Sequence, residues 1–142
     1  MKKFVKKNLE SITEKLCEIN NNCMGITKDD LNPEIPLSTQ EQWKKNNDIY
    51  NAYYFIATTA SLTAFLGLYG SVKESIEIAY EIGRNIDDLS NIENTKEITR
   101  DYLSAFMYYA SFLVSASLTK KSFENMEKTK LKKKNSYTSE KQ

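Results

Sequence analysis

The segment that decides the fold of this chain is residues 49–72, IYNAYYFIATTASLTAFLGLYGSV, in which 24 consecutive residues include no Asp, Glu, Lys or Arg. A second charge-free segment follows at residues 102–119, YLSAFMYYASFLVSASLT. Elsewhere charge is frequent, because the 142 residues include 20 Lys and Arg and 19 Asp and Glu. Apolar segments of this length form either the two central helices of a soluble bundle or a pair of membrane-spanning helices.

Capping signals predict where the helices begin. Ser38-Thr-Gln-Glu41 has the pattern of a capping box and is expected to open a long helix. Ser71-Val-Lys-Glu74 has the same pattern directly after Gly70, so a separate helix is expected to begin there. A turn is expected at residues 85–91, before the last helix. The four expected helices lie around residues 5–19, 39–69, 71–84 and 95–128.

The first of these helices is amphipathic. Its apolar residues are spaced by four, three, four and three positions: Val5, Leu9, Ile12, Leu16 and Ile19. This spacing places them on one face, and we expect that face to dock on the bundle. Four lysines near its N-terminal end oppose the helix dipole, which leaves open a role in binding a membrane surface or a partner.

The predicted fold class is therefore all-α, a compact four-helix bundle, or five helices if Thr27-Lys-Asp-Asp30 opens a short turn. We expect a single helical domain over residues 1–130. Residues 131–142 are rich in Lys, Ser and Asn, and this composition predicts a disordered basic tail.

The residue types that are missing restrict the chemistry. The chain has no His, which excludes Ser-His-Asp triads, His-based zinc sites and the usual proton shuttle at neutral pH. Cys17 and Cys23 lie six positions apart, which fits neither a C-x-x-C redox pair nor a zinc half-site. We therefore expect no enzyme, no cofactor and no metal site. Two free thiols and the lack of an apolar leader indicate a cytoplasmic protein.

A membrane hairpin is the first alternative, with spans at residues 49–72 and 102–119. The segment between the spans is acidic, whereas Lys44, Lys45, Lys120 and Lys121 flank the outer ends. This asymmetry would place both termini in the cytoplasm, with the protein in the inner or plasma membrane as a pore-forming or anchoring component. Both segments are rich in Ser, Thr and Tyr, however, and this polarity favours the soluble bundle.

Two sets of residues are candidates for binding. The aromatic candidates for a partner surface are Trp43, Tyr53, Tyr54, Tyr108 and Tyr109. The basic candidates for binding a polyanion are Lys128, Lys130, Lys132, Lys133 and Lys134. Residues 120–142 carry a net charge of +5, but residues 21–119 carry −6 and would repel nucleic acid.

The function predicted from these features is that of a non-enzymatic helical module that binds another protein. An inhibitor, an immunity-type protein or an adaptor, of the kind that mobile elements encode, would act in this way. The partner could also be a second copy of the chain, in a homodimer. A second alternative is an accessory subunit of a nucleoprotein complex that uses the basic tail.

Overall fold

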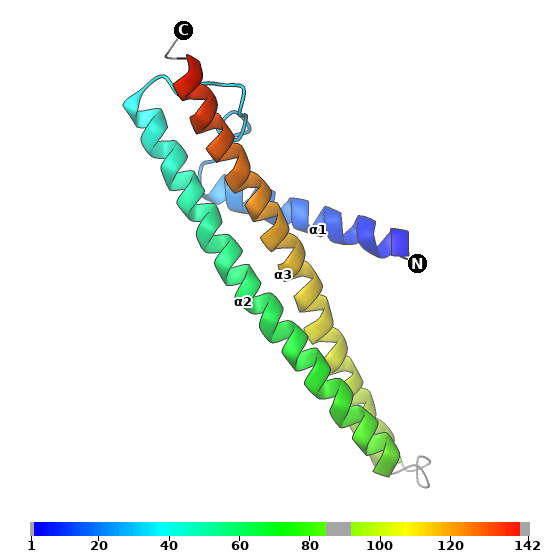
Figure 1. Ribbon diagram of the computed structural model, residues 1–142. Helices are drawn as coiled ribbons and strands as arrows, with labels where there is room; N and C mark the ends of the chain where they lie inside the picture. Colours follow the sequence, from blue (N-terminus) through cyan, green and yellow to red (C-terminus); the bar gives the residue numbers. More distant parts are fainter. Residues whose placement is uncertain (1, 85–91, 140–142) are drawn as a thin grey trace. The chain divides into compact units, whose positions relative to one another are not determined.

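The computed structural model describes residues 2–84 and 92–139, which form three α-helices and no strand (Figure 1). The helices are α1, Lys2–Cys23; α2, Gln40–Arg84; and α3, Ile92–Ser139. The all-α prediction is confirmed. The chain divides into two compact units: unit 1 comprises Met1–Ser61 and Ala116–Gln142, and unit 2 comprises Leu62–Ser115. Both α2 and α3 contribute residues to both units.

The prediction of four helices is wrong, because the helices expected at 39–69 and 71–84 are one continuous helix, α2. The expected break after Gly70 does not occur. A Cβ atom on Gly67 would lie 2.9 Å from the carbonyl oxygen of Tyr108 and 3.0 Å from the backbone nitrogen of Phe112. Gly67 therefore allows close approach of α2 and α3 in unit 2. Close packing offsets the helix propensity that Gly lacks, about 1 kcal/mol.

The cap of α2 lies one residue later than the sequence suggested. The hydroxyl of Thr39 accepts a hydrogen bond from the backbone N–H of Gln42, at 3.2 Å. The Oε1 atom of Gln42 in turn accepts hydrogen bonds from the backbone N–H groups of Ser38 and Thr39. These reciprocal bonds form a capping box at Thr39-Gln-Glu-Gln42, because the Gln side chain can reach back to the amides that α2 leaves unpaired.

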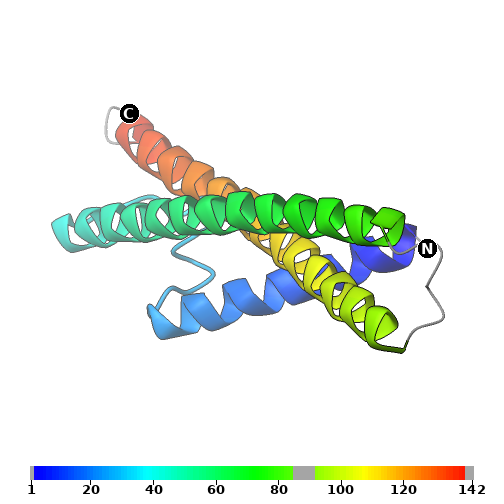
Figure 2. The ribbon, with the colours of Figure 1, turned by 90° about the horizontal axis from the view of Figure 1, so that it is seen from below.

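A connector of residues 24–39 joins α1 to α2 (Figure 2). Gly25 ends α1 with a positive φ of 64°, and Ile26 donates a backbone hydrogen bond to the carbonyl of Asn21. Thr27 and Asp30 bond to each other through side chain and backbone, which closes a turn at this point. The segment is thus a turn and not a fifth helix.

The docking face of α1 differs from the expected one. Val5, Ile12 and Ile19 are 47–57% exposed, whereas Thr13 and Cys17 are buried. The hydroxyl of Thr13 donates to the carbonyl of Leu9 and contacts the hydroxyl of Ser117 in α3. Leu9 and Leu16 of the predicted stripe are half-buried, so the docking face includes part of the stripe and is rotated from it towards Thr13 and Cys17.

The core of unit 1 is formed by the connector, the first half of α2 and the second half of α3. Its buried residues are Ile26, Ile49, Tyr53, Ala57 and Met126. Polar bonds cross the same elements: the Asn46 side-chain amide donates to the carbonyl of Thr129, and the backbone N–H of Leu37 donates to the hydroxyl of Ser136. These bonds fix the C-terminal part of α3 against α2 and the connector.

The disordered tail is a second correction. Residues 131–139 continue α3, and both Lys132 and Ser136 are buried. Their polar groups find partners in the connector, and this tertiary packing overrides the polar composition of the segment. Residues 140–142 and the turn expected at residues 85–91 lie outside the described residues. The single domain expected over residues 1–130 stays a prediction.

Unit 2 has a narrow inner face of small residues. In α2, Ala64, Gly67 and Ser71 follow one another at spacings of three and four, and Ala105 and Ser115 occupy the facing part of α3. Ala64, Ala105 and Ser115 are each 9% exposed. Small residues on the inner face bring the two helices close together, and most large apolar side chains of α2 in this unit are exposed on its other faces.

Candidate interaction surfaces

The largest exposed apolar surface on α2 belongs to unit 2, and we call it the α2 stripe. Its eight side chains are 43–69% exposed. They are Leu62, Phe65, Leu66, Leu68, Tyr69, Val72, Ile76 and Tyr80. At 100° per residue these positions centre on the face of α2 opposite to its inner face of small residues. The second half of α2 is thus apolar on two opposite faces, which is typical of a helix that is covered on both sides.

A second surface lies on the first half of α3, and we call it the α3 stripe. Its five side chains are 47–68% exposed. They are Tyr102, Leu103, Phe106, Met107 and Tyr109. Arg100 stands next to this stripe and forms ion pairs with Glu97 and Asp101. The α3 stripe therefore combines an aromatic and Met-rich centre with a charged border.

Taken together, the two stripes exceed what a monomer normally exposes. If each large apolar residue leaves roughly 100 Å² accessible, the α2 stripe exposes about 800 Å² and the α3 stripe about 500 Å². The largest apolar patch on a typical monomer is about 300–600 Å². The two stripes together therefore indicate a surface that another molecule covers.

The five aromatic residues predicted to bind a partner do not come together. Trp43, Tyr53 and Tyr54 belong to unit 1, whereas Tyr108 and Tyr109 belong to unit 2. Tyr53 is 1% exposed and lies in the core of unit 1, where no partner reaches it. Tyr109 is part of the α3 stripe. The sequence-based prediction missed Phe65, Tyr69 and Phe106. In α2 the helical spacing places large apolar residues opposite small ones, and this pattern could have indicated an exposed surface.

The five lysines predicted to bind a polyanion also separate. Lys130 lies over the ring of Tyr50, and Lys133 lies over the ring of Trp43, which itself packs on Tyr137 at 4.7 Å between ring centroids. Lys132 is buried, while Lys128 and Lys134 are exposed. At helical spacing Lys130, Lys133 and Lys134 share one face of α3, whereas Lys128 and the buried Lys132 lie on another, so the five lysines do not form one surface.

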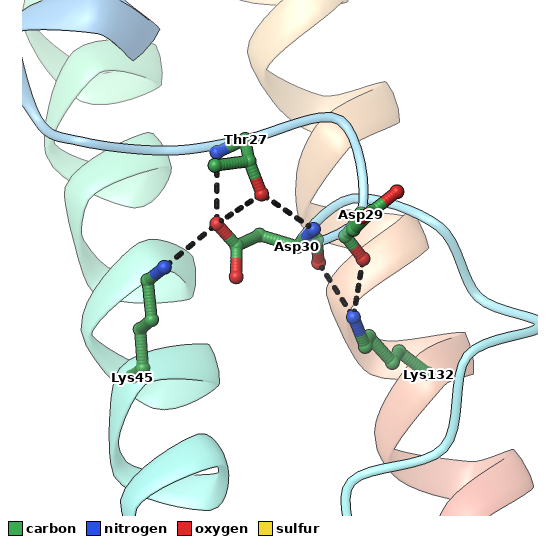
Figure 3. Close-up of polar contacts among 5 residues, drawn as sticks. All are labelled: Thr27, Asp29, Asp30, Lys45 and Lys132. Carbon is green, nitrogen blue, oxygen red and sulfur yellow. Dashed lines mark hydrogen bonds and ion pairs between the residues drawn. The ribbon is translucent and has the colours of Figure 1, made fainter.

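Lys132 anchors the connector to α3 (Figure 3). Its ammonium group donates hydrogen bonds to the backbone carbonyls of Asp29 and Asp30. Burial lowers the pKa of Lys132, although the nearby carboxylates of Asp30 and Asp29 oppose this effect. On the other side, the Asp30 carboxylate accepts a bond from Lys45 of α2 at 2.8 Å. This cluster holds the connector between α2 and α3, which is a structural role.

A cleft of 730 Å³ in unit 1 is lined by α1, the connector and α3. Charges of both signs border it, including Glu14, Glu18 and Lys128. Burial raises the pKa of the Cys17 thiol in this cleft, and nearby Lys121 only partly compensates. A raised pKa leaves little reactive thiolate at neutral pH. The cleft therefore has space for a polar ligand but an unactivated thiol.

A smaller cavity of 110 Å³ borders Asn46 and Lys132. The buried Oδ1 atom of Asn46 has no hydrogen-bond partner among the described residues. The cavity is well below the size of sites for drug-sized ligands or cofactors, which are about 300–1,000 Å³.

The hairpin alternative required two membrane-spanning helices. Among the described helices, only α2 is long and apolar enough to cross a membrane by length and composition, and 22% of the qualifying segment is buried within the protein. A signal sequence or the core helix of a soluble protein, which is mostly buried, meets the same criterion, so one such helix is weak evidence for a membrane span.

Comparison with protein-family models, with curated proteins and with solved structures finds no match for this chain.

Proposed function

We propose that this chain is a non-enzymatic helical module that binds another protein through the α3 stripe of unit 2. The single observation that carries the proposal is the exposure of Tyr102, Phe106 and Met107, each more than 60% exposed on one stretch of helix. Aromatic residues and Met are enriched in protein interfaces, and large aromatic anchors often dominate the binding energy. Inhibitors, immunity-type proteins and adaptors all act by presenting such a surface.

The border of the stripe fits a protein partner. Arg100 and the carboxylates of Glu97 and Asp101 lie beside it and pair with each other within α3. Protein interfaces combine an apolar centre with a polar rim of this kind. We propose that the rim selects the partner by charge, because rim charges contribute more to specificity than to affinity.

The placement of residues 49–72 supports a protein partner over a membrane hairpin. Residues 49–61 belong to unit 1, where Tyr50 lies beneath the ammonium group of Lys130 and the hydroxyl of Tyr53 donates to Asn21. Only residues 62–72 are outside unit 1, and 11 helical residues extend about 16 Å. A bilayer core requires about 30 Å. The nucleoprotein alternative has weaker support, because only Lys130, Lys133 and Lys134 share a face of α3, and two of these three lie over aromatic rings of α2.

The test uses a photo-crosslinking residue in place of Phe106, compared with the same residue in place of Phe123. Both positions are exposed on α3, but Phe123 belongs to unit 1. In the host cell we expect a discrete protein adduct from position 106 and none of that size from position 123. Adding Met107→Glu should reduce the adduct at least tenfold.

The same cells are lysed, washed with carbonate and centrifuged to locate the untagged chain. The proposal requires the chain in the soluble fraction. If only detergent releases the chain, or if position 106 reacts with lipid and with no protein, the proposed function is wrong.

A further inference from the structure

We propose that the α2 stripe pairs with the α2 stripe of a second copy of this chain, antiparallel, about a twofold axis near Gly70 and Ser71. This interface lies on a different helix from the α3 stripe. The inference therefore goes beyond the proposed function, and each can fail without the other.

The first argument is the spacing of the stripe. Its central line follows Leu62, Phe65, Tyr69, Val72, Ile76 and Tyr80, at intervals of three and four residues. Reversing this series about the point between residues 70 and 71 superimposes it on itself within one residue. Tyr69 then faces Val72 of the second copy, and Phe65 faces Ile76. A twofold interface requires this self-complementarity, because each contact occurs twice.

The second argument is area. The α2 stripe exposes about 800 Å² of apolar surface, which is the area that one partner typically contributes to a stable protein interface. Within unit 2 the inner face of α2 is formed mainly by the small residues Ala64, Gly67 and Ser71, and the one large apolar side chain on it is the half-buried Ile78. Most of the apolar surface of this helix half is therefore available to the second copy and not to its own chain.

The third argument is charge, which selects a second copy over lipid and antiparallel over parallel. Ile76 and Tyr80 belong to the stripe but stand among Lys73, Glu77 and Glu81, so two of its eight residues lie in charged sequence that lipid would exclude. A parallel pair would bring Glu77 beside its own copy. In the antiparallel pair the two Glu77 residues are separated by 13 residue positions, about 20 Å along the helix.

The test measures the mass of the purified full-length chain by sedimentation equilibrium across a range of concentrations. We expect a dimer, with twice the chain mass of 16.4 kDa. Tyr69→Glu should weaken dimerisation at least tenfold. Tyr102→Glu is the matched control, because Tyr102 is equally exposed but lies on the α3 stripe, and it should leave the dimer unchanged. Circular dichroism checks that each variant stays helical.

A second measurement tests the orientation without altering the stripe. A spin label on Arg84→Cys, in a chain with Cys17→Ala and Cys23→Ser, reports the distance between the two labels of a dimer. The antiparallel pair predicts about 40 Å, since the labels are 27 residue positions apart along the axis. A separation under about 20 Å would overturn the antiparallel arrangement. A monomer at all concentrations would overturn the dimer, while a soluble monomer that still crosslinks through position 106 leaves the proposed function standing.

Discussion

At the scale of single residues, Tyr53 shows how a buried hydroxyl couples stability to pH. Burial raises the pKa of Tyr53 to about 12, although hydrogen bonds with Asn125 and Asn21 act in the opposite direction. The pKa of Tyr in an unfolded chain is about 10. Since the folded pKa is the higher one, the stabilising effect of Tyr53 is fully present below pH 10 and is lost as pH rises towards 12.

We therefore predict that Tyr53→Phe lowers the free energy of unfolding at pH 7 by about 1–2 kcal/mol, because Asn21 and Asn125 lose a buried partner. The same variant should lose less stability than the wild type between pH 10 and 12. Urea unfolding at a series of pH values measures both effects. Tyr54→Phe is the control, since Tyr54 is adjacent but exposed, and it should change neither quantity. An equal alkaline loss in Tyr53→Phe and wild type would contradict the assignment.

Asp30 acts at the opposite end of the pH scale. Partial burial alone would raise the pKa of its carboxyl group, but hydrogen bonds from Lys45 and Thr27 outweigh burial and lower the pKa. With the folded pKa below the unfolded one, Asp30 stabilises the protein above about pH 4, and this stabilisation is lost as pH falls through the folded pKa.

The expected result for Asp30→Asn is a loss of about 1–2 kcal/mol at pH 7, with a smaller further loss below pH 4 than in the wild type. Chemical unfolding at pH 7, 4 and 3 provides the measurement. Asp48→Asn, an exposed carboxylate of α2, serves as the comparison and should change stability at pH 7 by less than about 0.5 kcal/mol. If the two variants behave alike, the Asp30 cluster does not stabilise the connector.

At the scale of elements, two glycines of α2 should respond to alanine with opposite signs. A Cβ on Gly67 would meet the backbone of α3 at 2.9–3.0 Å, whereas a Cβ on Gly83 meets nothing within 4 Å. Gly67→Ala should cost about 1–3 kcal/mol, because backbone cannot move aside as a side chain can. Gly83→Ala should stabilise by about 0.5–1 kcal/mol through helix propensity. Thermal unfolding of both variants measures these changes in stability. Destabilisation of equal size in the two variants would contradict the close packing of α2 and α3 at Gly67.

The same glycines explain which elements the sequence could predict. The helical class and the existence of long helices followed from the charge-free segments and the spacing of apolar residues. The predicted break after Gly70 was wrong. A Gly that ends a helix and a Gly that admits a neighbouring helix look alike in sequence. The distinction depends on the position of Tyr108 and Phe112, which lie about 40 residues further along the chain.

The C-terminal segment failed as a prediction for a related reason. Its composition is that of a solvated tail, but Lys132 reaches the carbonyls of residues 29 and 30, and Ser136 pairs with Leu37. These contacts join parts of the chain that are about 100 residues apart, so no local pattern could reveal them. The division of the candidate lysines between two faces of α3 follows from the helix that this segment forms.

At the scale of the whole molecule, the candidate site was only partly predictable. The sequence indicated that exposed aromatic residues would bind a partner, and Tyr109 does lie on the α3 stripe. It did not separate core from surface, because small and large apolar residues alternate within the same segment. That alternation becomes informative once α2 is seen to place small residues towards α3 and large residues on the opposite face.

The uneven distribution of buried residues predicts uneven local stability. The core of unit 1 includes Ile49, Tyr53 and Met126, whereas the residues of unit 2 that are buried within the chain are small, such as Ala64 and Ala105. Local opening is easiest where few large apolar groups are buried. In the Tyr69→Glu variant, amides of residues 62–84 and 92–115 should therefore exchange hydrogen at least tenfold faster than those of residues 40–61 and 116–139.

In the wild type, the amides of residues 62–84 should exchange hydrogen more slowly as the protein concentration rises. Dimerisation covers the α2 stripe, so association stabilises unit 2. Hydrogen exchange with mass spectrometry at low and high concentration measures this directly, and residues 40–61 provide the internal reference. If unit 2 exchanges as slowly as unit 1 in the Tyr69→Glu variant, then its small inner face is sufficient for stability, and a partner would be needed for function alone.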